Sequence, residues 1–249
     1  MAGLGVGIRY DHSLARFVAT HAHAIDFVSV SPERLWIDHG AGAARRFVPV
    51  PQEVAALDML ADRFPLIARG AGLSIAASLD VDEAKLGQLA RWCGRYDFRW
   101  VGEQMGGMQT LPGMWDHERL ELVVERVRAT QRMLDRRVLL EHGTVSAPPT
   151  HASELIHRLC SGSGCGVLLE LGAACDTRRD DLELANVHEI HVEGSRARTE
   201  VWRTLDRVVP RCPNLRAITF ELHAPQLDDA GIVAQLAMAR GLWQQHHGA

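Results

Sequence analysis

Short apolar runs that each end in a polar residue recur along the whole chain. The clearest is residues 138–140, which follow two arginines and run directly into Glu141. A brief apolar run bounded by charge and glycine is typical of a fully buried strand. The same order of positions returns at residues 166–170, 189–193 and 217–221. The second half of the chain is therefore predicted to contain four successive buried strands.

The first half of the chain repeats this pattern, and apolar residues at helical spacing separate the runs. The strands predicted there cover residues 4–10, 24–30, 65–68 and 98–101. The helices predicted over the whole chain cover residues 13–21, 52–63, 82–92, 116–134, 148–160, 199–209 and 231–245. Strands that alternate with helices form a parallel sheet with helical crossovers, which is the α/β class.

Eight such units in 249 residues fit a closed (β/α)₈ TIM barrel. We expect residues 1–249 to form one barrel domain, with no linker or second domain. An open, doubly wound sheet is the alternative fold. Against it, no G-x-G-x-x-G phrase lies between the first strand and the first helix, and residues 69–72 carry only an isolated pair of glycines.

Composition narrows the protein class without identifying a function. The chain is 47% hydrophobic and 23% charged, with a formal net charge of -4, which gives no electrostatic reason to expect binding to nucleic acid or to an anionic membrane. No apolar stretch is long enough to span a bilayer, and the first residues do not resemble a signal peptide. The five scattered cysteines contain no C-x-x-C pair and indicate reduced thiols. We expect a cytoplasmic protein.

Four acid or imidazole side chains follow the last four predicted strands. They are Glu141, Glu170, His191 and Glu221. In a TIM barrel the C-terminal ends of the strands form the site, so these side chains are expected to converge. Three carboxylates and one imidazole suit Mn²⁺, Fe²⁺ or Mg²⁺, with Zn²⁺ or Co²⁺ as alternatives. One acid at a strand end is usually a solvated residue, and it is the succession of four that predicts a metal site.

Eight phrases spread over the chain add a resemblance to a known family. They are GLGVGIRYDHS, DFVSVSPERL, PLIARGAGLSI, WVGEQMG, LLEHGTVS, CGVLLELGAA, EIHVEGS and ITFEL. In order and spacing they resemble the multinuclear non-haem iron-dependent oxidative enzymes, the family of the methanobactin-biosynthesis oxidase. The resemblance implies a xylose-isomerase-like TIM barrel that binds two or three irons. It also implies dioxygen-dependent rearrangement or cleavage of ribosomal peptides, often with a small partner protein that presents the peptide.

The chain departs from this family at positions that the resemblance assigns to the flanking irons. Where the family's third strand ends in His-Gly, this chain has Arg69-Gly70, and where the fourth ends in Glu-His, it has Glu103-Gln104. A phrase that usually closes with histidine ends here in Ser195. The four strand-end ligands survive, and they are also the mononuclear pattern of the wider barrel superfamily. We therefore expect a metal centre of reduced nuclearity.

Three further residues are candidates for catalysis. His223 lies two positions beyond Glu221 and is a candidate ligand or acid/base. Arg69 can replace the charge of an absent metal by pairing with Glu103 or Glu141, or it can bind an anionic substrate. His223, Arg69 and Glu103 are thus the predicted catalytic residues.

Three functions remain open at this point. The first is a metal-dependent enzyme, with iron as cofactor and manganese or zinc as alternatives, that oxidises or rearranges a peptide or another natural-product precursor. The second is a mononuclear-metal isomerase, epimerase or lyase acting on a small polyol-like substrate. The third is a metal-free barrel in which Arg69 neutralises the acids and the protein acts as a scaffold or peptide-binding partner.

Overall fold

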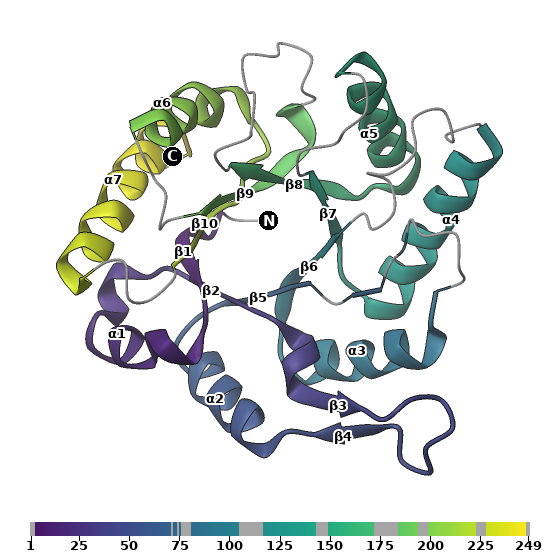
Figure 1. Cartoon of the computed structure of the whole chain (residues 1–249). Coiled ribbons are helices and arrows are strands. Elements are labelled where there is room, and N and C mark those ends of the chain that lie inside the picture. Colours follow the sequence, from purple (N-terminus) through teal and green to yellow (C-terminus); the bar gives the residue numbers. More distant parts are fainter. Residues whose placement is uncertain are drawn as a thin grey trace.

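Eight parallel strands surrounded by helices form a closed barrel in the computed structural model of the chain (Figure 1). The structure describes residues 3–70, 72, 73, 75, 81–104, 117–142, 149–171, 184–193, 199–222 and 228–247, with only the backbone at 142 and 149–153. The barrel strands are β1 Gly5–Arg9, β2 Val28–Val30, β5 Leu66–Arg69, β6 Phe98–Gln104, β7 Val138–His142, β8 Gly166–Leu171, β9 Val187–Glu193 and β10 Ala217–Glu221. Their order around the ring is β1-β10-β9-β8-β7-β6-β5-β2, and β1 closes it by pairing with β2. The predicted TIM barrel is confirmed.

The seven predicted helices are all present and lie outside the ring of strands (Figure 1). They are α1 Ala15–Thr20, α2 Pro51–Ala61, α3 Glu83–Arg95, α4 His117–Leu134, α5 Pro149–Ser163, α6 Thr199–Val208 and α7 Asp229–His247. Their ends follow local chemistry: α3, for example, begins after Asp82, whose carboxylate accepts a hydrogen bond from the Lys85 backbone N–H. In the part of the chain that the structure describes, no helix has both the length and the apolar character needed to cross a membrane.

Two local features differ from the sequence prediction. The strand predicted at residues 24–30 forms only at Val28–Val30. Just before this strand, the Asp26 carboxylate accepts hydrogen bonds from the Val6 backbone N–H and from the Arg240 guanidinium. A small antiparallel hairpin between β2 and α2 was not predicted. It pairs β3 Trp36–Asp38 with β4 Phe47–Pro49, and it lies outside the barrel, beside α2 and on the outer side of α3 (Figure 1).

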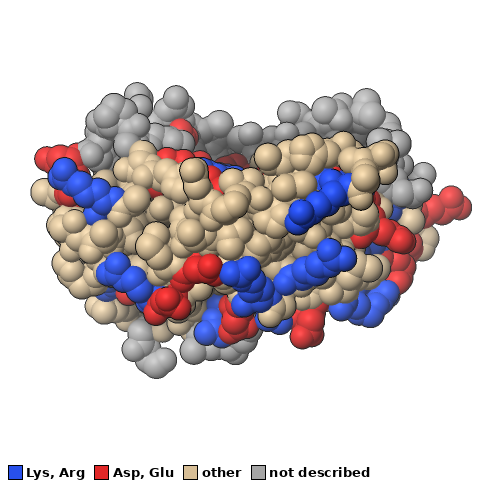
Figure 2. Space-filling view, turned by 90° about the horizontal axis from the view of Figure 1, so that it is seen from below, with Lys and Arg blue, Asp and Glu red and all other residues tan. Residues whose placement is uncertain are grey.

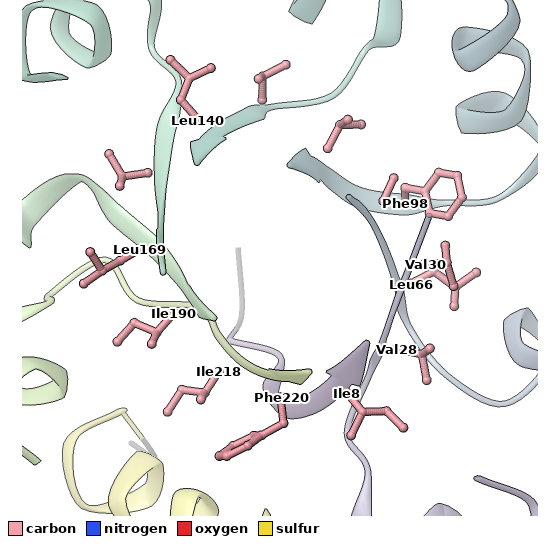
Figure 3. Packing of buried hydrophobic residues seen from close by; sticks show 14 of the residues in the cluster. Ile8, Val28, Val30, Leu66, Phe98, Leu140, Leu169, Ile190, Ile218 and Phe220 are labelled. Atoms are coloured by element: carbon pink, nitrogen blue, oxygen red, sulfur yellow. The ribbon is translucent and has the colours of Figure 1, made fainter. Parts of the chain in front are cut away.

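The apolar residues of each barrel strand divide between its two faces. Ten of the outward-facing ones are labelled in Figure 3, where they point away from the barrel axis toward the helices. They are Ile8, Val28, Val30, Leu66, Phe98, Leu140, Leu169, Ile190, Ile218 and Phe220. This layer between strands and helices is the larger part of the core, and it explains why the barrel strands have nearly continuous apolar runs.

The inward-facing residues form a second, smaller cluster, which we call the floor. Its members are Phe27, Ile67, Trp100, Leu139, Leu168 and Ala217, with Leu4 packed against them. Successive side chains on a strand alternate between its faces, so the residue two positions further on also points inward. Two positions beyond Ile67, Leu139 and Leu168 stand a guanidinium and two carboxylates. We call this second, polar layer the mouth, because it lies toward the C-terminal ends of the strands.

Candidate functional site

Arg69 is the buried cation of the mouth. It is the last residue of β5, and only 4% of its surface is exposed. Gly70 follows with a φ of 77°, a conformation that glycine adopts at little cost, and it turns the chain away from the barrel directly after Arg69. Next to it on β6, a Cβ at Gly102 would lie 3.4 Å from Arg69 Cγ and 3.2 Å from Leu168 Cδ1. The absence of a side chain at Gly102 therefore leaves room for the arginine to lie across the barrel.

The guanidinium of Arg69 joins three strands on the other side of the barrel. Its Nη2 donates to Glu141 Oε2 at 2.9 Å and to Glu170 Oε1 at 3.3 Å. Its Nη1 lies 2.5 Å from Nδ1 and 2.7 Å from Nε2 of His191. A neutral imidazole has only one nitrogen with a free lone pair, so one of these two nitrogens accepts the hydrogen bond. One side chain thus binds three of the four residues that the sequence predicts as metal ligands.

Charge balance keeps this arginine ionised. Burial by itself would lower the pKa of Arg69, but the attraction of Glu141, Glu189 and Glu170 outweighs that effect and raises the pKa. A guanidinium has five N–H donors and no acceptor, which suits a position between carboxylates and an imidazole. Arg69 is therefore a permanent positive charge at the centre of the mouth.

His191 is neutral in this setting. Burial, together with the nearby Arg69 charge, lowers the pKa of His191 to about 4, although Glu170 and Glu221 favour protonation. The two carboxylates lie at opposite ring nitrogens: Glu170 Oε1 is 3.5 Å from Nδ1, and Glu221 Oε2 is 3.3 Å from Nε2. The contact with His191 and the charge of Arg69 in turn lower the pKa of Glu170. The imidazole is thus a neutral link between two carboxyl groups.

The network continues toward solvent through Arg9, at the end of β1. Its Nη1 donates to Glu221 Oε1 at 3.0 Å, and its Nη2 donates to the Ser31 hydroxyl at 3.2 Å. The side chains of Arg9 and Glu221 are 31% and 24% exposed. Positive and negative groups therefore alternate across the mouth, from buried Arg69 to half-exposed Arg9.

Beneath the mouth lies a buried acid that the sequence analysis did not select. Glu189 is on β9, two residues before His191, and 1% of its surface is exposed. Its oxygens accept hydrogen bonds from Trp100 Nε1 at 2.8 Å and from the Thr219 hydroxyl at 2.6 Å. Burial raises the pKa of Glu189. Strand alternation was the available signal, because Glu189 and His191 must face the same side of β9.

The other predicted catalytic residues lie elsewhere. Glu103 pairs in register with the outward-facing Leu140, so it is on the outer face of β6. It is buried there, and it accepts a hydrogen bond from the Leu73 backbone N–H at 2.7 Å. This contact anchors the segment after β5 and does not face the mouth. His223 and Ser195 are outside the described residues.

The arrangement of the predicted ligands can be tested against the needs of a metal ion. A metal needs its donor atoms to converge on one point, and a bound imidazole offers it one nitrogen. Here Glu170 and Glu221 lie at opposite nitrogens of His191, and the Arg69 guanidinium fills the space between Glu141 and the ring. Within the described part of the chain, no three His, Cys, Asp or Glu side chains are grouped to hold a metal. The four residues meet, but their present arrangement fits a guanidinium and not a metal.

Comparisons with known proteins agree with the resemblance seen in the sequence. The family model described as RiPP precursor modification enzyme MbnB/TglH/ChrH matches residues 3–210. A UPF0276 protein of Nitrosospira multiformis is 30% identical over 164 residues, which are 62% of this chain and 54% of that protein. A UPF0276 protein of Caulobacter vibrioides is 24% identical over 97% of this chain and 94% of its own length.

Solved structures share the fold at low sequence identity. A xylose isomerase domain protein from Alicyclobacillus acidocaldarius matches with a TM-score of 0.57 and 16% identity, over 98% of each chain. Endonuclease IV from Thermus thermophilus matches with a TM-score of 0.56 and 16% identity, over 97% of this chain and 99% of that one. These likenesses show the TIM-barrel fold.

Proposed function

Since the chain belongs to the family of RiPP precursor modification enzymes MbnB/TglH/ChrH, we propose that its barrel mouth binds a ribosomally made precursor peptide. We further propose that Arg69, in place of a metal, balances the carboxylates of that mouth. The observation that carries the proposal is the contact of one guanidinium with Glu141, Glu170 and His191. It corresponds to the third function left open by the sequence, a metal-free, peptide-binding barrel.

The groups that a peptide would meet are those at the outer side of the network. The Glu170 side chain is 38% exposed, and Arg9 and Glu221 are also partly exposed. Carboxylate oxygens accept hydrogen bonds from backbone N–H groups, and a guanidinium donates to backbone carbonyls or to an acidic side chain. Because Arg69 and His191 are buried beneath them, these outer groups are held in position before a ligand arrives.

Selection from a random-peptide display library on the immobilised full chain tests this proposal. Peptides enriched on the wild type should bind Glu170→Gln and Arg9→Ala about tenfold more weakly, because each change removes a charged hydrogen-bonding group from the mouth. Glu154→Gln is the matched control, since Glu154 is an exposed acid on the outer helix α5 that pairs with Arg158 in the same helix. Enriched peptides that bind all four proteins equally would place peptide binding outside the mouth.

The second candidate is metal-dependent modification of the peptide, and the family membership favours it. The neutral His191 and the three carboxylates provide the donor types for iron, manganese or zinc. To hold such an ion they would have to rearrange, with Arg69 leaving Glu141 and Glu170. Bound iron would supply oxidative chemistry, whereas a single manganese or zinc would favour the isomerase, epimerase or lyase alternative.

Elemental analysis of the purified chain separates these candidates. Two or more irons per chain support an oxidative enzyme, and one manganese or zinc supports the mononuclear alternative. Absence of bound metal from protein grown with all three metals supports the Arg69-centred mouth.

A further inference from the structure

A hollow outside the barrel is lined by arginines and aromatic rings. It has a volume of about 470 Å³ and lies between α3 and the β3–β4 hairpin. Its lining is Arg45, Arg46, Phe47, Pro49, Gln88, Arg91, Trp92 and Arg95. A hollow of this size is within the range of small-ligand pockets. We call it the hairpin groove.

The four arginines of the hairpin groove differ in how fully their charge is balanced. Arg46 donates to both oxygens of Asp38 at 2.9 Å, and Arg95 donates to Asp58 at 2.9 and 3.1 Å. Among the described residues, no carboxylate lies within ion-pair distance of Arg45 or Arg91, and both are exposed. Figure 2 shows the face of the molecule that carries α2, α3 and the hairpin, with basic and acidic side chains interspersed. Arg45 and Arg91 therefore give the groove a local surplus of positive charge.

The aromatic part of the groove contains an indole N–H without a hydrogen-bond acceptor among the described residues. Trp92 stacks between Trp36 and Tyr96, with ring centroids 6.4 and 5.9 Å away. It is 7% exposed, and within the described part of the chain its indole N–H has no hydrogen-bond acceptor. A buried donor in this state is satisfied when a ligand brings an oxygen to it. The groove thus offers cations, ring surface and one spare donor, and its ligand should bring acceptor oxygens and apolar surface together.

We propose that the hairpin groove is a docking site for an acidic peptide segment that also carries apolar or aromatic side chains. Carboxylates of the segment pair with Arg45 and Arg91, an oxygen accepts from the Trp92 indole, and an apolar side chain packs on Phe47 and Pro49. The peptide as ligand class rests on the proposed function. When one segment of a precursor peptide is docked in the groove, the effective concentration of its reactive segment at the mouth rises.

The charges around the groove favour a peptide over a nucleic acid, and the position of the hairpin relates the groove to the mouth. Asp38, Asp58 and Asp82 stand beside the arginines and would repel a continuous phosphate backbone, and the net charge of the chain is -4. The hairpin also belongs to the connection that leaves the C-terminal end of β2, the same end of the barrel that carries Arg69. A peptide held in the groove can therefore extend toward the mouth.

Fluorescence anisotropy with the full chain tests the docking site. The probe is a fluorescein-labelled ten-residue peptide that alternates Glu with Leu and Phe, and its partner has Gln at every Glu. The acidic probe should bind more tightly than the Gln probe, and Arg45→Glu with Arg91→Glu should weaken it by about tenfold or more. Trp92→Phe, which keeps a ring but removes the N–H donor, should weaken it about threefold.

Matched controls exclude general electrostatic attraction. Arg128→Glu with Arg132→Glu makes the same charge change in a second arginine-lined hollow, on α4, and should leave binding unchanged. The mouth is tested separately, by the effect of Glu170→Gln and Arg9→Ala on the library-selected peptides, so failure of the groove and failure of the proposed function are distinguishable. Equal weakening by both double variants, no effect of Arg45→Glu with Arg91→Glu, or tighter binding of a ten-nucleotide RNA would each overturn the proposal.

Discussion

The floor and the mouth of the barrel both bury carboxylates, and they stabilise them in opposite ways. Glu189, which pairs in register with the floor residues Leu168 and Ala217, is bound by two neutral donors, the Trp100 indole and the Thr219 hydroxyl, and burial raises its pKa. In the mouth, Glu141 and Glu170 are bound by the Arg69 guanidinium, and the pKa of Glu170 is lowered. Only one residue separates the two layers along each strand, yet burial raises the pKa of Glu189, whereas the contacts with His191 and Arg69 lower the pKa of Glu170.

This difference predicts which layer depends on an ion pair. A buried carboxyl group held by neutral donors needs only hydrogen bonds, and a neutral replacement of the same shape can accept and donate them. A buried guanidinium between carboxylates is stabilised by their charges. Removal of one partner leaves an uncompensated buried charge, whose desolvation lowers the stability of the fold. Substitutions in the mouth should therefore cost more than matched substitutions in the floor.

Removal of the mouth cation should have the largest effect. Arg69→Met keeps much of the side-chain volume but leaves Glu141 and Glu170 without their shared donor, and it should lower the free energy of unfolding by about 3–5 kcal/mol. Urea unfolding at neutral pH measures this. Arg16→Met is the control, because the Arg16 side chain is 89% exposed, and it should change stability by less than about 0.5 kcal/mol. A loss below about 1 kcal/mol for Arg69→Met would place its contacts among ordinary surface ion pairs.

The second-largest effect is a dependence of stability on pH. The pKa of His191 is about 4 in the folded protein against 6.5 as its ordinary value, so between these values the unfolded chain binds a proton that the folded chain does not. The free energy of unfolding should thus fall by about 3 kcal/mol as the pH falls from 6.5 to 4. Glu189 acts in the opposite sense: its stabilising contribution is lost as the pH rises from 4.5 through its raised pKa.

Unfolding curves at several pH values isolate the His191 contribution. His191→Gln cannot titrate and should flatten the acid side of the profile, whereas His39→Gln in the exposed hairpin connection should not. An unchanged slope in the His191 variant would show that other groups cause the acid dependence.

Replacement of carboxylates by amides compares the layers directly. Glu189→Gln can accept from Trp100 and donate to the Thr219 hydroxyl, so it should cost less than about 1 kcal/mol. Glu141→Gln removes a charge opposite Arg69 and should cost about 2 kcal/mol. Thermal unfolding of both variants at neutral pH provides the test, and the reverse order of the two losses would contradict the claim that the mouth depends on an ion pair more than the floor does.

The smallest effect is expected at the solvent side of the mouth. Arg9→Ala breaks the pair with Glu221, whose members are about one quarter to one third exposed, and should cost about 0.5 kcal/mol. Because water and salt screen this pair, the difference from wild type should shrink as the salt concentration is raised. A loss as large as that of Arg69→Met would mean that the two arginines act as one buried unit.

The fold could be predicted because its signal is repeated. Short apolar runs that alternate with amphipathic helical segments identify parallel strands with helical crossovers. Such strands bring Glu141, Glu170, His191 and Glu221 to one end of a barrel. The hairpin escaped prediction because its strands Trp36–Asp38 and Phe47–Pro49 have three residues each and are flanked by charge and proline. Strands of three residues are too short to show an alternation of apolar and polar positions.

The arrangement within the site depends on which side chain crosses the barrel, and a sequence pattern does not contain that information. Arg69 was expected to pair with Glu103 or Glu141, and the two acids differ in the face of the strand that they occupy. A bulge in the pairing between β5 and β6, where Leu66 faces Phe98 but Ala68 faces Val101, shifts the later β6 residues by one position. Gly102 consequently faces the mouth, and Glu103 faces outward.

Metal content is the most direct test of the claim that a guanidinium and not a metal holds the mouth together. The chain and Arg69→His with Gln104→His should be produced in medium rich in iron, manganese and zinc, and metal per chain should be measured after gel filtration. The account predicts no bound metal in the wild type and a gain of about one equivalent in the double variant, because two new imidazoles replace a cation that repels metals. A full equivalent of metal in the wild type that is lost in Glu141→Ala would contradict the account.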